Sequence, residues 1–456
     1  MFRICSFLLF ATALAAEPAD WIWSGRYVIT MNAQRRVIEN GAVAIRNDRI
    51  AGVGTRNEID ARFQAKQRLD RPDAILAPGL INTHTHAAMS LFRGISDDLN
   101  LQDWLNKFIF PAEAKNVSAE FVRWGTRLGV LEMLLGGTTT FTDMYYFEDV
   151  VAEVAKEAGM RGVLGETIIG FPVADAKTPA DSLRFTEGYL KRFQNDPLVV
   201  AAVAPHAIYT NSDETLKASR ALANKYRAPL IIHVSETKKE NDDELAKRHM
   251  TPSKALDTLG VFNGRTVAAH CVWVNDSDMA ILKMRGVGVA HCPSSNMKLA
   301  SGVAPVLKMR AMGIAVGLGP DGPAGSNNDF NLFEEMDLAA KLQKVTSMDP
   351  QALPATAALE MATIAGARVL GMEKEIGSLE MGKRADLITV RLDRANSVPV
   401  YDPVSQMVYA LKAEDVRDVM VNGKMVVRDA RILTLNAAQV LQKAAEYRAK
   451  IGASLK

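Results

Sequence analysis

Two rhythms of hydrophobic and polar positions alternate along this chain of 456 residues. Short β-type stretches cover residues 21–30 and 41–54 near the start, and a further strand is predicted at residues 385–390. Residues 416–427 predict a hairpin that turns on Asn422-Gly423, a dipeptide suited to a tight type I′ turn. These pieces predict one small β domain that is built from both ends of the chain.

The middle of the chain has a different pattern, in which short apolar runs alternate with longer helical segments. The runs cover residues 75–86, 138–144, 161–167, 199–206, 229–236, 265–271, 287–294 and 314–321. Strands that alternate with helices predict a parallel sheet, and eight such units predict a closed barrel. An open doubly wound sheet is the alternative, but the glycine-rich phosphate turn that it would carry after an early strand is missing. We therefore expect an α/β protein, a (β/α)8 TIM-type barrel with a small β-sandwich domain built from both chain ends.

The first residues follow another pattern, that of a secretory signal peptide. Arg3 precedes an apolar run that ends at about Leu14, and Ala13, Ala15 and Ala16 stand before Glu17. The run is too short for a permanent membrane span, which needs about 20 apolar residues. The expected boundaries are a signal peptide at 1–16, the β-sandwich domain at 17–77 and 375–432, the barrel at 78–374 and a C-terminal helix at 433–456. We expect a periplasmic or secreted protein with no membrane segment in its mature form.

Charge and cysteine content narrow the function classes. The chain has 54 basic and 52 acidic residues, a net charge of +2, which does not suit a general binder of nucleic acid or anionic membranes. Cys271 and Cys292 are the two cysteines after the signal peptide, and two cysteines in a chain of this size form no disulfide framework, so we expect two buried thiols. The expected partner is a small-molecule substrate, and a homo-oligomer is left open.

Six of the seven histidines end predicted strands, which is where the active site of a barrel lies. His84 and His86 are two residues apart on one strand, so their side chains point to the same face and can reach one ion. Neutral imidazole is a good ligand for zinc or iron. The other four are His206, His233, His270 and His291. Such a concentration at one end of a barrel predicts a metal or polar catalytic centre.

Two acidic residues complete this centre. Asp321 ends the eighth run, where it can bind a metal with one oxygen and hold a water molecule with the other. Glu236 lies three residues beyond His233, just past the strand end, where it can act as a proton carrier.

The segments that contain these residues resemble those of a known family. The segments that carry the resemblance are residues 78–86, 204–209, 233–237, 269–271, 291–296, 319–322 and 377–387. Nearly the whole mature chain resembles the amidohydrolase superfamily, in the branch of the 5-methylthioadenosine/S-adenosylhomocysteine deaminases and the related triazine hydrolases. The resemblance implies one divalent metal ion, zinc or alternatively iron, with the ligands His84, His86, His233 and Asp321. His270 would contact the attacking water. Binuclear relatives carry a carboxylated lysine at the end of the fourth strand, where this chain has His206, which favours a single ion.

The resemblance also implies a reaction and a substrate. Asp321 would accept a proton from a metal-activated water, and Glu236 would protonate a ring nitrogen before ammonia leaves. Glu113 would bind both ribose hydroxyls and His206 the nucleoside, while Trp104 would stack beside it or belong to the core. Glu166 falls at or beside a position where members that accept S-adenosylhomocysteine often carry an arginine, and a carboxylate there would repel the substrate's own.

The expected function is therefore a hydrolytic deaminase of an adenine nucleoside, namely 5-methylthioadenosine, S-adenosylhomocysteine or adenosine. It would be an aminohydrolase that acts on the C–N bonds of cyclic amidines. The alternative is a hydrolase or deaminase of another aminated or halogenated heterocycle, such as a triazine, a pterin or a free purine. A non-catalytic barrel that serves as a scaffold is disfavoured because no metal ligand is missing.

Overall fold

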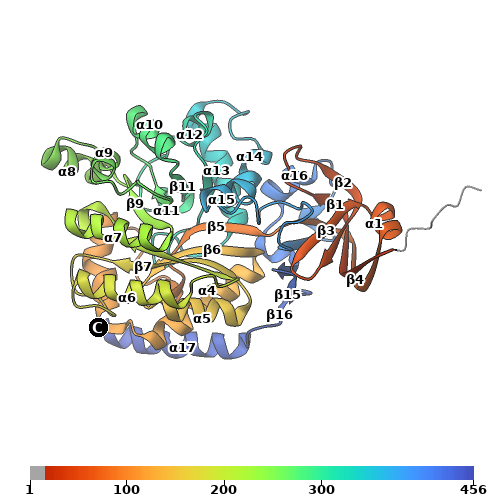
Figure 1. Cartoon of the computed structure of the whole chain (residues 1–456), viewed down its shortest axis with the longest axis horizontal. Helices are drawn as coiled ribbons and strands as arrows, with labels where there is room; N and C mark the ends of the chain where they lie inside the picture. Colours follow the sequence, from red (N-terminus) through yellow and green to blue (C-terminus); the bar gives the residue numbers. More distant parts are fainter. Residues whose placement is uncertain (1–15, 456) are drawn as a thin grey trace, which may run out of the picture.

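The computed structural model describes residues 16–455, which form a barrel with a sheet beside it (Figure 1). The expected signal peptide, residues 1–16, lies outside this range except for its last residue. No helix within residues 16–455 is both long and apolar enough to cross a membrane.

Eight parallel strands close into the barrel in the order β10-β11-β12-β5-β6-β7-β8-β9. Their bounds are β5 Leu80–Thr85, β6 Thr138–Tyr145, β7 Arg161–Ile168, β8 Val199–Pro205, β9 Leu230–Val234, β10 Thr266–His270, β11 Gly288–His291 and β12 Val316–Leu318. All eight predicted runs supply a barrel strand, so the (β/α)8 prediction is confirmed. The run predicted at 75–86 is split, because its first residues end a strand of the other sheet. At the break, Gly79 passes so close to Thr139 that a Cβ atom would collide with that side chain.

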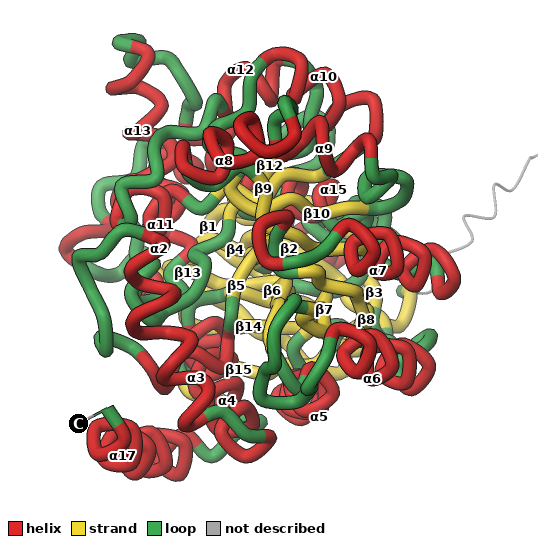
Figure 2. The backbone as a smooth tube through the Cα atoms, turned by 90° about the vertical axis from the view of Figure 1, so that its left-hand side faces the viewer, coloured by secondary structure: helices red, strands yellow, loops and turns green. Residues whose placement is uncertain are grey.

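Helices surround the barrel, as Figure 2 shows with strands in the centre and helices around them. Those up to the seventh strand are α2 Leu101–Asp103, α3 Phe110–Asn116, α4 Ala119–Leu135, α5 Glu148–Ala158, α6 Pro179–Arg192, α7 Asp213–Tyr226, α8 Lys238–Arg248, α9 Pro252–Thr258 and α10 Asp276–Arg285. The later ones are α11 Pro293–Lys298, α12 Val306–Ala311, α13 Leu332–Ser347, α14 Ala355–Met361, α15 Ile364–Val369 and α16 Pro403–Ser405. A π-helical turn, Trp104–Ile109, joins α2 to α3.

The second unit is a mixed sheet to which both chain ends contribute, as predicted. Its order is β16-β15-β14-β13-β4-β1-β2-β3. The bounds are β1 Glu17–Ile29, β2 Val37–Arg46, β3 Arg49–Thr55, β4 Phe63–Pro78, β13 Leu387–Arg391, β14 Val416–Val421, β15 Lys424–Arg428 and β16 Arg431–Ile432. Helix α1, Arg56–Arg62, connects β3 to β4. Trp23, Val43, Leu76, Leu387 and Met420 belong to one buried cluster, so early and late strands share a core.

Two local predictions about the ends of the chain are confirmed. Asn422 and Gly423 have φ angles of 50° and 76°, as the central residues of a type I′ turn require. The C-terminal segment forms α17, Ala437–Ser454, with the Asn436 side chain capping its first turn. This helix packs on α4, where the rings of Tyr447 and Phe121 meet edge to face at 5.7 Å.

Candidate metal centre and active site

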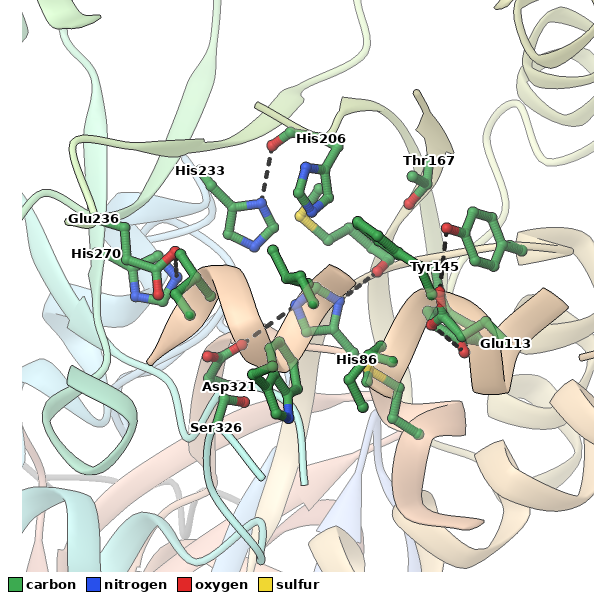
Figure 3. Close-up of a pocket in the computed structure, with 18 of the residues that line it drawn as sticks. His86, Glu113, Tyr145, Thr167, His206, His233, Glu236, His270, Asp321 and Ser326 are labelled. Atoms are coloured by element: carbon green, nitrogen blue, oxygen red, sulfur yellow. Dashed lines mark hydrogen bonds and ion pairs between the residues drawn. The ribbon is translucent and has the colours of Figure 1, made fainter. Parts of the chain in front are cut away.

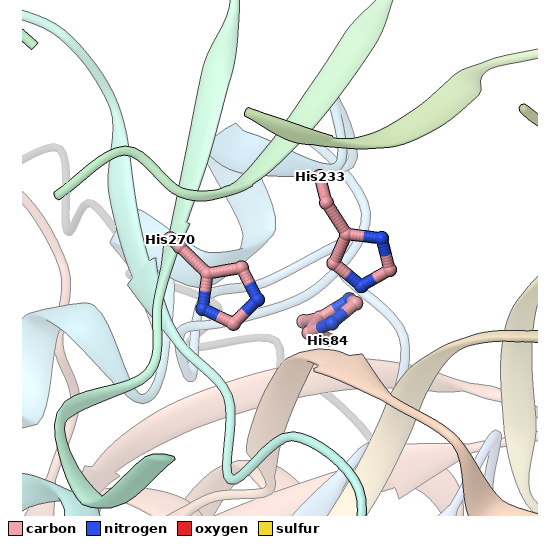
Figure 4. A group of neighbouring side chains, drawn as sticks. All are labelled: His84, His233 and His270. Carbon is pink, nitrogen blue, oxygen red and sulfur yellow. The ribbon is translucent and has the colours of Figure 1, made fainter. Parts of the chain in front are cut away.

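The four residues predicted as metal ligands lie together at the carboxyl ends of the barrel strands. His84 is on β5, His86 follows it, His233 is on β9 and Asp321 follows β12. The Nε2 atoms of His84 and His86 each lie 3.3 Å from Oδ1 of Asp321, and Figure 3 shows the contact of His86. Candidate ligand atoms of His84, His233 and His270 form a second group within 4.8 Å of one another (Figure 4).

These donors fit a metal ion. His84 is fully buried, and Nε2, the nitrogen that faces Asp321, has no hydrogen-bond partner among the described residues. Burial lowers the pKa of His84 to about 4 and holds that of His233 well below its usual value, so both rings are neutral, as ligands must be. Burial alone would also lower the pKa of His86, but Asp321 outweighs it and raises that pKa to about 9. The Asp321 carboxylate thus favours one positive charge at this place. The second proton of His86 can supply that charge, and a bound metal cation would replace this proton.

Neighbouring groups orient the ligands. His86 Nδ1 lies 2.7 Å from the carbonyl oxygen of Met144, and His233 Nδ1 lies 2.9 Å from that of His206. A carbonyl oxygen can only accept, so both Nδ1 atoms carry the proton and both Nε2 atoms are free to bind a metal. Ser295 on α11 donates a hydrogen bond of 2.7 Å to Oδ2 of Asp321. His86, His233 and Asp321 are therefore each fixed from behind.

The backbone at these strand ends is unusual. Ser235, His270, Cys271 and Asp321 have φ angles of 50°, 72°, 49° and 66°, in the left-handed region that residues other than glycine rarely adopt. Such strain concentrates at functional sites, where the surrounding structure enforces it. Here it accompanies the turns that aim His270 and Asp321 into the barrel mouth.

Glu236 and His270 form the proton-transfer side of the site. Oε2 of Glu236 lies 3.8 Å from Nε2 of His270, and both side chains are buried. Burial, assisted by the charge of Asp321, raises the pKa of Glu236 to about 8, so this carboxyl group is protonated at neutral pH. His270 Nδ1 lies 3.0 Å from Oδ1 of Asn296, and burial lowers the pKa of His270. A protonated Glu236 next to a neutral His270 suits the predicted role of a general acid.

Sequence reasoning missed the residues that hold this pair. Glu240, in the first turn of α8, accepts hydrogen bonds from the backbone N–H groups of Ser235 at 3.0 Å and Glu236 at 2.8 Å. Burial raises the pKa of Glu240 to about 8, and the two N–H donors oppose that rise. Thr237 caps the same helix at the N–H of Glu240, so the Thr-x-x-Glu spacing of a capping box was visible in the sequence. In a capping box the Glu side chain accepts a hydrogen bond from the backbone N–H of the capping residue, here Thr237. Glu240 instead accepts from the N–H groups of Ser235 and Glu236, and so holds the loop that carries Glu236.

Glu113 lines the opposite side of the same cavity (Figure 3). It is 6% exposed and accepts hydrogen bonds from the hydroxyls of Tyr145 at 2.7 Å and Tyr146 at 3.5 Å. Burial raises the pKa of Glu113 to about 7 although these donors favour its ionised form. The structure thus places a carboxyl group at the end of the cavity remote from Glu236, and within residues 16–455 this group forms no ion pair.

The other two predicted substrate contacts also line the cavity. The Trp104 indole N–H donates to the carbonyl oxygen of Ala324 at 2.9 Å, which fixes this buried ring in the cavity wall. His206 lies with its ring centroid 4.8 Å from that of His233, and its Nδ1 is 3.0 Å from the hydroxyl of Thr210.

The expectation that Glu166 faces the substrate is wrong. Glu166 is fully buried, and its Oε2 accepts a hydrogen bond from the N–H of Glu148 at 2.9 Å, behind the barrel wall. Thr167, the next residue on β7, lines the cavity instead, because successive side chains of a strand point to opposite faces. The repulsion expected between Glu166 and a substrate carboxylate therefore does not arise.

One wall of the cavity comes from a single stretch of chain. Residues 101–116 contribute Leu101, Trp104, Leu105, Ile109, Phe110 and Glu113. The space that remains is about 60 Å³, room for only a few water molecules. A larger ligand therefore requires these residues to move outward, and the π-helical turn Trp104–Ile109 is an irregularity at which such a segment can adjust.

Comparisons with known proteins place this site in a family. The model of the amidohydrolase family matches residues 75–426, which include every residue of the site described in this section. The chain belongs to the amidohydrolase family. It is 45% identical to 5-methylthioadenosine/S-adenosylhomocysteine deaminase 1 of Syntrophus aciditrophicus over 96% of this chain and 99% of that protein. The corresponding deaminase of Syntrophobacter fumaroxidans is 46% identical over 94% of this chain and 98% of its own.

Two solved structures show the same architecture. An adenosine deaminase from Xanthomonas campestris with bound zinc superposes with a TM-score of 0.94 at 38% identity, over 96% of this chain and all of that one. An atrazine chlorohydrolase from Arthrobacter aurescens in complex with zinc has a TM-score of 0.84 at 23% identity, over 94% and 100% of the two chains, and supports the fold alone. Together with the family match, the first of these confirms the resemblance seen in the sequence.

Proposed function

We propose that the protein is a hydrolytic deaminase of adenine nucleosides with a single metal ion, zinc, at the centre described above. The observation that carries the proposal is the pair of carboxyl groups at opposite sides of one cavity. Glu236 lies beside the metal ligands, where a proton must be moved, and Glu113 lies at the far side, where it can bind a ribose. Support comes from the relatives named as deaminases and from the zinc in the Xanthomonas structure.

The residues of this chain divide the chemistry. A divalent cation held by His84, His86, His233 and Asp321 would lower the pKa of a water molecule to about 7. Asp321 would accept the proton of that water, with Ser295 holding its second oxygen in place. The protonated Glu236 would deliver its proton to the ring nitrogen next to the amino-bearing carbon, and His270 would hydrogen-bond to the attacking oxygen. Asp321 would then pass its proton to the amino group, so that the C–N bond breaks and ammonia leaves, while Glu236 would recover a proton from the new hydroxyl group.

Glu113 would supply specificity for a ribose. A carboxylate can accept about four hydrogen bonds, and Tyr145 and Tyr146 use two of them. The remaining two match the two hydroxyls of a cis-diol. His206 and Trp104 would form the walls on either side of the nucleoside.

The proposal is tested by ammonia release from purified metal-loaded protein with adenosine, 5-methylthioadenosine, S-adenosylhomocysteine, adenine, a pterin and a triazine. We expect turnover of the nucleosides, and a Glu113→Ala variant that loses roughly 100-fold in kcat/KM on them, since each charge-assisted hydrogen bond contributes about 1.5–3 kcal/mol. Equal turnover of nucleoside and free base, with no effect of Glu113→Ala, would instead establish the heterocycle alternative.

We also propose that the mature protein is exported. The support is the charged, apolar and small-residue pattern of residues 1–16. Mass spectrometry of protein purified from its native cells should find an N-terminus near Glu17. A chain that still carries Arg3 would contradict the removal of a signal peptide.

A further inference from the structure

The backbone of Asp321 is held on its barrel side by the neighbouring strand β5. Its N–H donates to the carbonyl oxygen of His84 at 3.2 Å, and its own carbonyl oxygen accepts from the hydroxyl of Thr85 at 2.9 Å. These bonds involve neither the carbonyl oxygen of Pro320, which precedes Asp321, nor the carboxylate Oδ2 atom. Other elements fix those two oxygens.

Two polar side chains from outside the barrel supply these contacts. The side-chain NH2 group of Asn327 donates to the carbonyl oxygen of Pro320 at 2.9 Å. This bond sets the peptide plane directly before Asp321, whose φ of 66° lies in the left-handed region. The hydroxyl of Ser295 donates to Oδ2 of Asp321 at 2.7 Å and so sets the rotation of the carboxylate. The orientation of Asp321 therefore depends on the loop that follows it and on the first turn of α11.

Both of these segments meet at one side chain of α13, Glu335. Its Oε1 accepts a hydrogen bond from the side-chain NH2 group of Asn327 at 3.3 Å. Its Oε2 accepts one from the backbone N–H of Ser294, the residue before Ser295, at 3.3 Å. Glu335 is fully buried, and a buried carboxyl group costs free energy unless donors meet its oxygens. Here each donor belongs to a segment that holds Asp321.

The same loop is also attached to the cavity wall that has to move when a larger ligand enters. The carbonyl oxygen of Ala324 accepts the indole N–H of Trp104 at 2.9 Å. Outward movement of Trp104 would therefore displace the loop that begins at Asp321, unless that loop were anchored elsewhere. The hydrogen bond between Asn327 and Glu335 supplies such an anchor.

We propose that Glu335 is a positioning residue for Asp321, which it keeps in the orientation needed to bind the metal and to accept a proton from water. It acts along two routes, one through Asn327 and the other through the first turn of α11. This inference rests on the proposed function, because it takes Asp321 to be both a metal ligand and the base.

The experiment removes both acceptor oxygens and keeps the volume of the side chain. Glu335→Met leaves the donors of Asn327 and Ser294 without an acceptor. The rate at which a chelator removes the metal from the loaded protein should rise and kcat should fall, each by roughly 10- to 100-fold, as happens when groups behind metal ligands are removed. KM should change little, because Glu335 is not among the described residues that line the catalytic cavity.

Gln343→Met is the matched control on the same helix. Gln343 lies about two turns after Glu335 and is 3% exposed. Its side chain donates a hydrogen bond of 3.2 Å to the carbonyl oxygen of Ala304, which is outside the loop that carries Asp321. Both methionine variants should lower the unfolding temperature, but Gln343→Met should leave metal release and kcat at their wild-type values.

A second substitution tests the route through Asn327. Asn327→Leu keeps the approximate shape of the side chain and removes its donor, so it should also speed metal release and lower kcat. The double variant with Glu335→Met should show an effect well below the product of the two single fold-changes, because residues of one hydrogen-bonded network do not act independently.

Three results would overturn the inference and leave the proposed function intact. These are wild-type metal release and kcat in Glu335→Met, equal losses in Glu335→Met and Gln343→Met, or single effects that multiply in the double variant. If Glu335→Met does not fold, Asn327→Leu decides alone, and unchanged metal release in that variant would reject the positioning role. A wild-type protein that binds no metal and turns over no nucleoside would instead contradict the proposed function itself.

Discussion

Glu240 offers the sharpest test of how the catalytic loop is held. Its carboxyl group is buried and accepts two backbone hydrogen bonds, from Ser235 at 3.0 Å and from Glu236 at 2.8 Å. Ser235 has a left-handed φ of 50°, so the loop would relax if its amides were not held. In Glu240→Gln the side chain keeps one acceptor oxygen but turns an NH2 group toward the second N–H.

The size of the effect follows from the group that loses its partner. A buried donor without an acceptor costs about 1–3 kcal/mol. Since 1.4 kcal/mol corresponds to a factor of ten, the population with Glu236 in its reactive position should fall roughly 5- to 150-fold. We expect that loss in kcat with little change in KM. Metal content should remain stoichiometric, because His233 lies on β9 ahead of the affected loop.

Glu244→Gln provides the matched control. Glu244 lies one turn further along α8, is equally buried and pairs with Arg248 at 2.6 Å, without contact to the loop. Both variants should lower the unfolding temperature, but only Glu240→Gln should lower kcat. If the two lose activity in parallel with stability, or if Glu240→Gln stays within twofold of wild-type kcat, Glu240 has no positioning role.

Three further expectations concern the metal, the proton and the fold. His233→Ala should lose bound metal and activity together, and elemental analysis that finds one metal ion per chain would contradict its role as a ligand. Glu236→Gln should keep its metal yet lose roughly 10²–10⁴-fold in kcat, as general acid–base groups do, and a loss below threefold would reassign the proton transfer. Burial and the neighbouring Asp175 raise the pKa of Glu166 well above its usual value. Its contribution to stability is thus complete below the unfolded pKa of about 4.3 and is lost as pH rises toward the folded value. Glu166→Gln should therefore gain unfolding temperature relative to wild type as the pH rises above about 4.3, and a difference that stays constant with pH would contradict the shift.

Much of the fold and the metal centre could be predicted because local pattern and chemistry coincide there. Each barrel strand is a short apolar run that ends in a chemically distinctive residue, so the eight runs and their order follow from the sequence. His84 and His86 share a face because strand side chains alternate with a period of two. The split of the first run at Gly79 could not be predicted, since it depends on the contact with Thr139, 60 positions along the chain.

The sequence predictions were wrong or incomplete where the placement of a side chain depends on the strand register to within one residue, or on a contact that the sequence pattern does not show. Glu166 and Thr167 are neighbours on β7, and a shift of one position exchanges the side chain inside the cavity for the one behind it. Asn296 contacts His270, 26 positions away in the chain, so spacing alone could not show it. Glu240 holds residues only four and five positions before it, but its spacing indicates no more than a helix cap. The ligand set was easier to find because every member belongs to a strand end.

The arrangement of Asp321 and Glu236 shows how one cavity gives two carboxyl groups different tasks. Burial alone would raise the pKa of both, and for Glu236 it does so, to about 8, with the charge of Asp321 adding to the rise. The pKa of Asp321 lies well below its usual value, because the neighbouring His84 and His86, whose Nε2 atoms lie 3.3 Å from it, outweigh burial. A bound cation would add to that difference, since it lies against Asp321 and favours its ionised form. At neutral pH one carboxyl group can therefore accept a proton from water while the other already carries the proton that the ring nitrogen must receive.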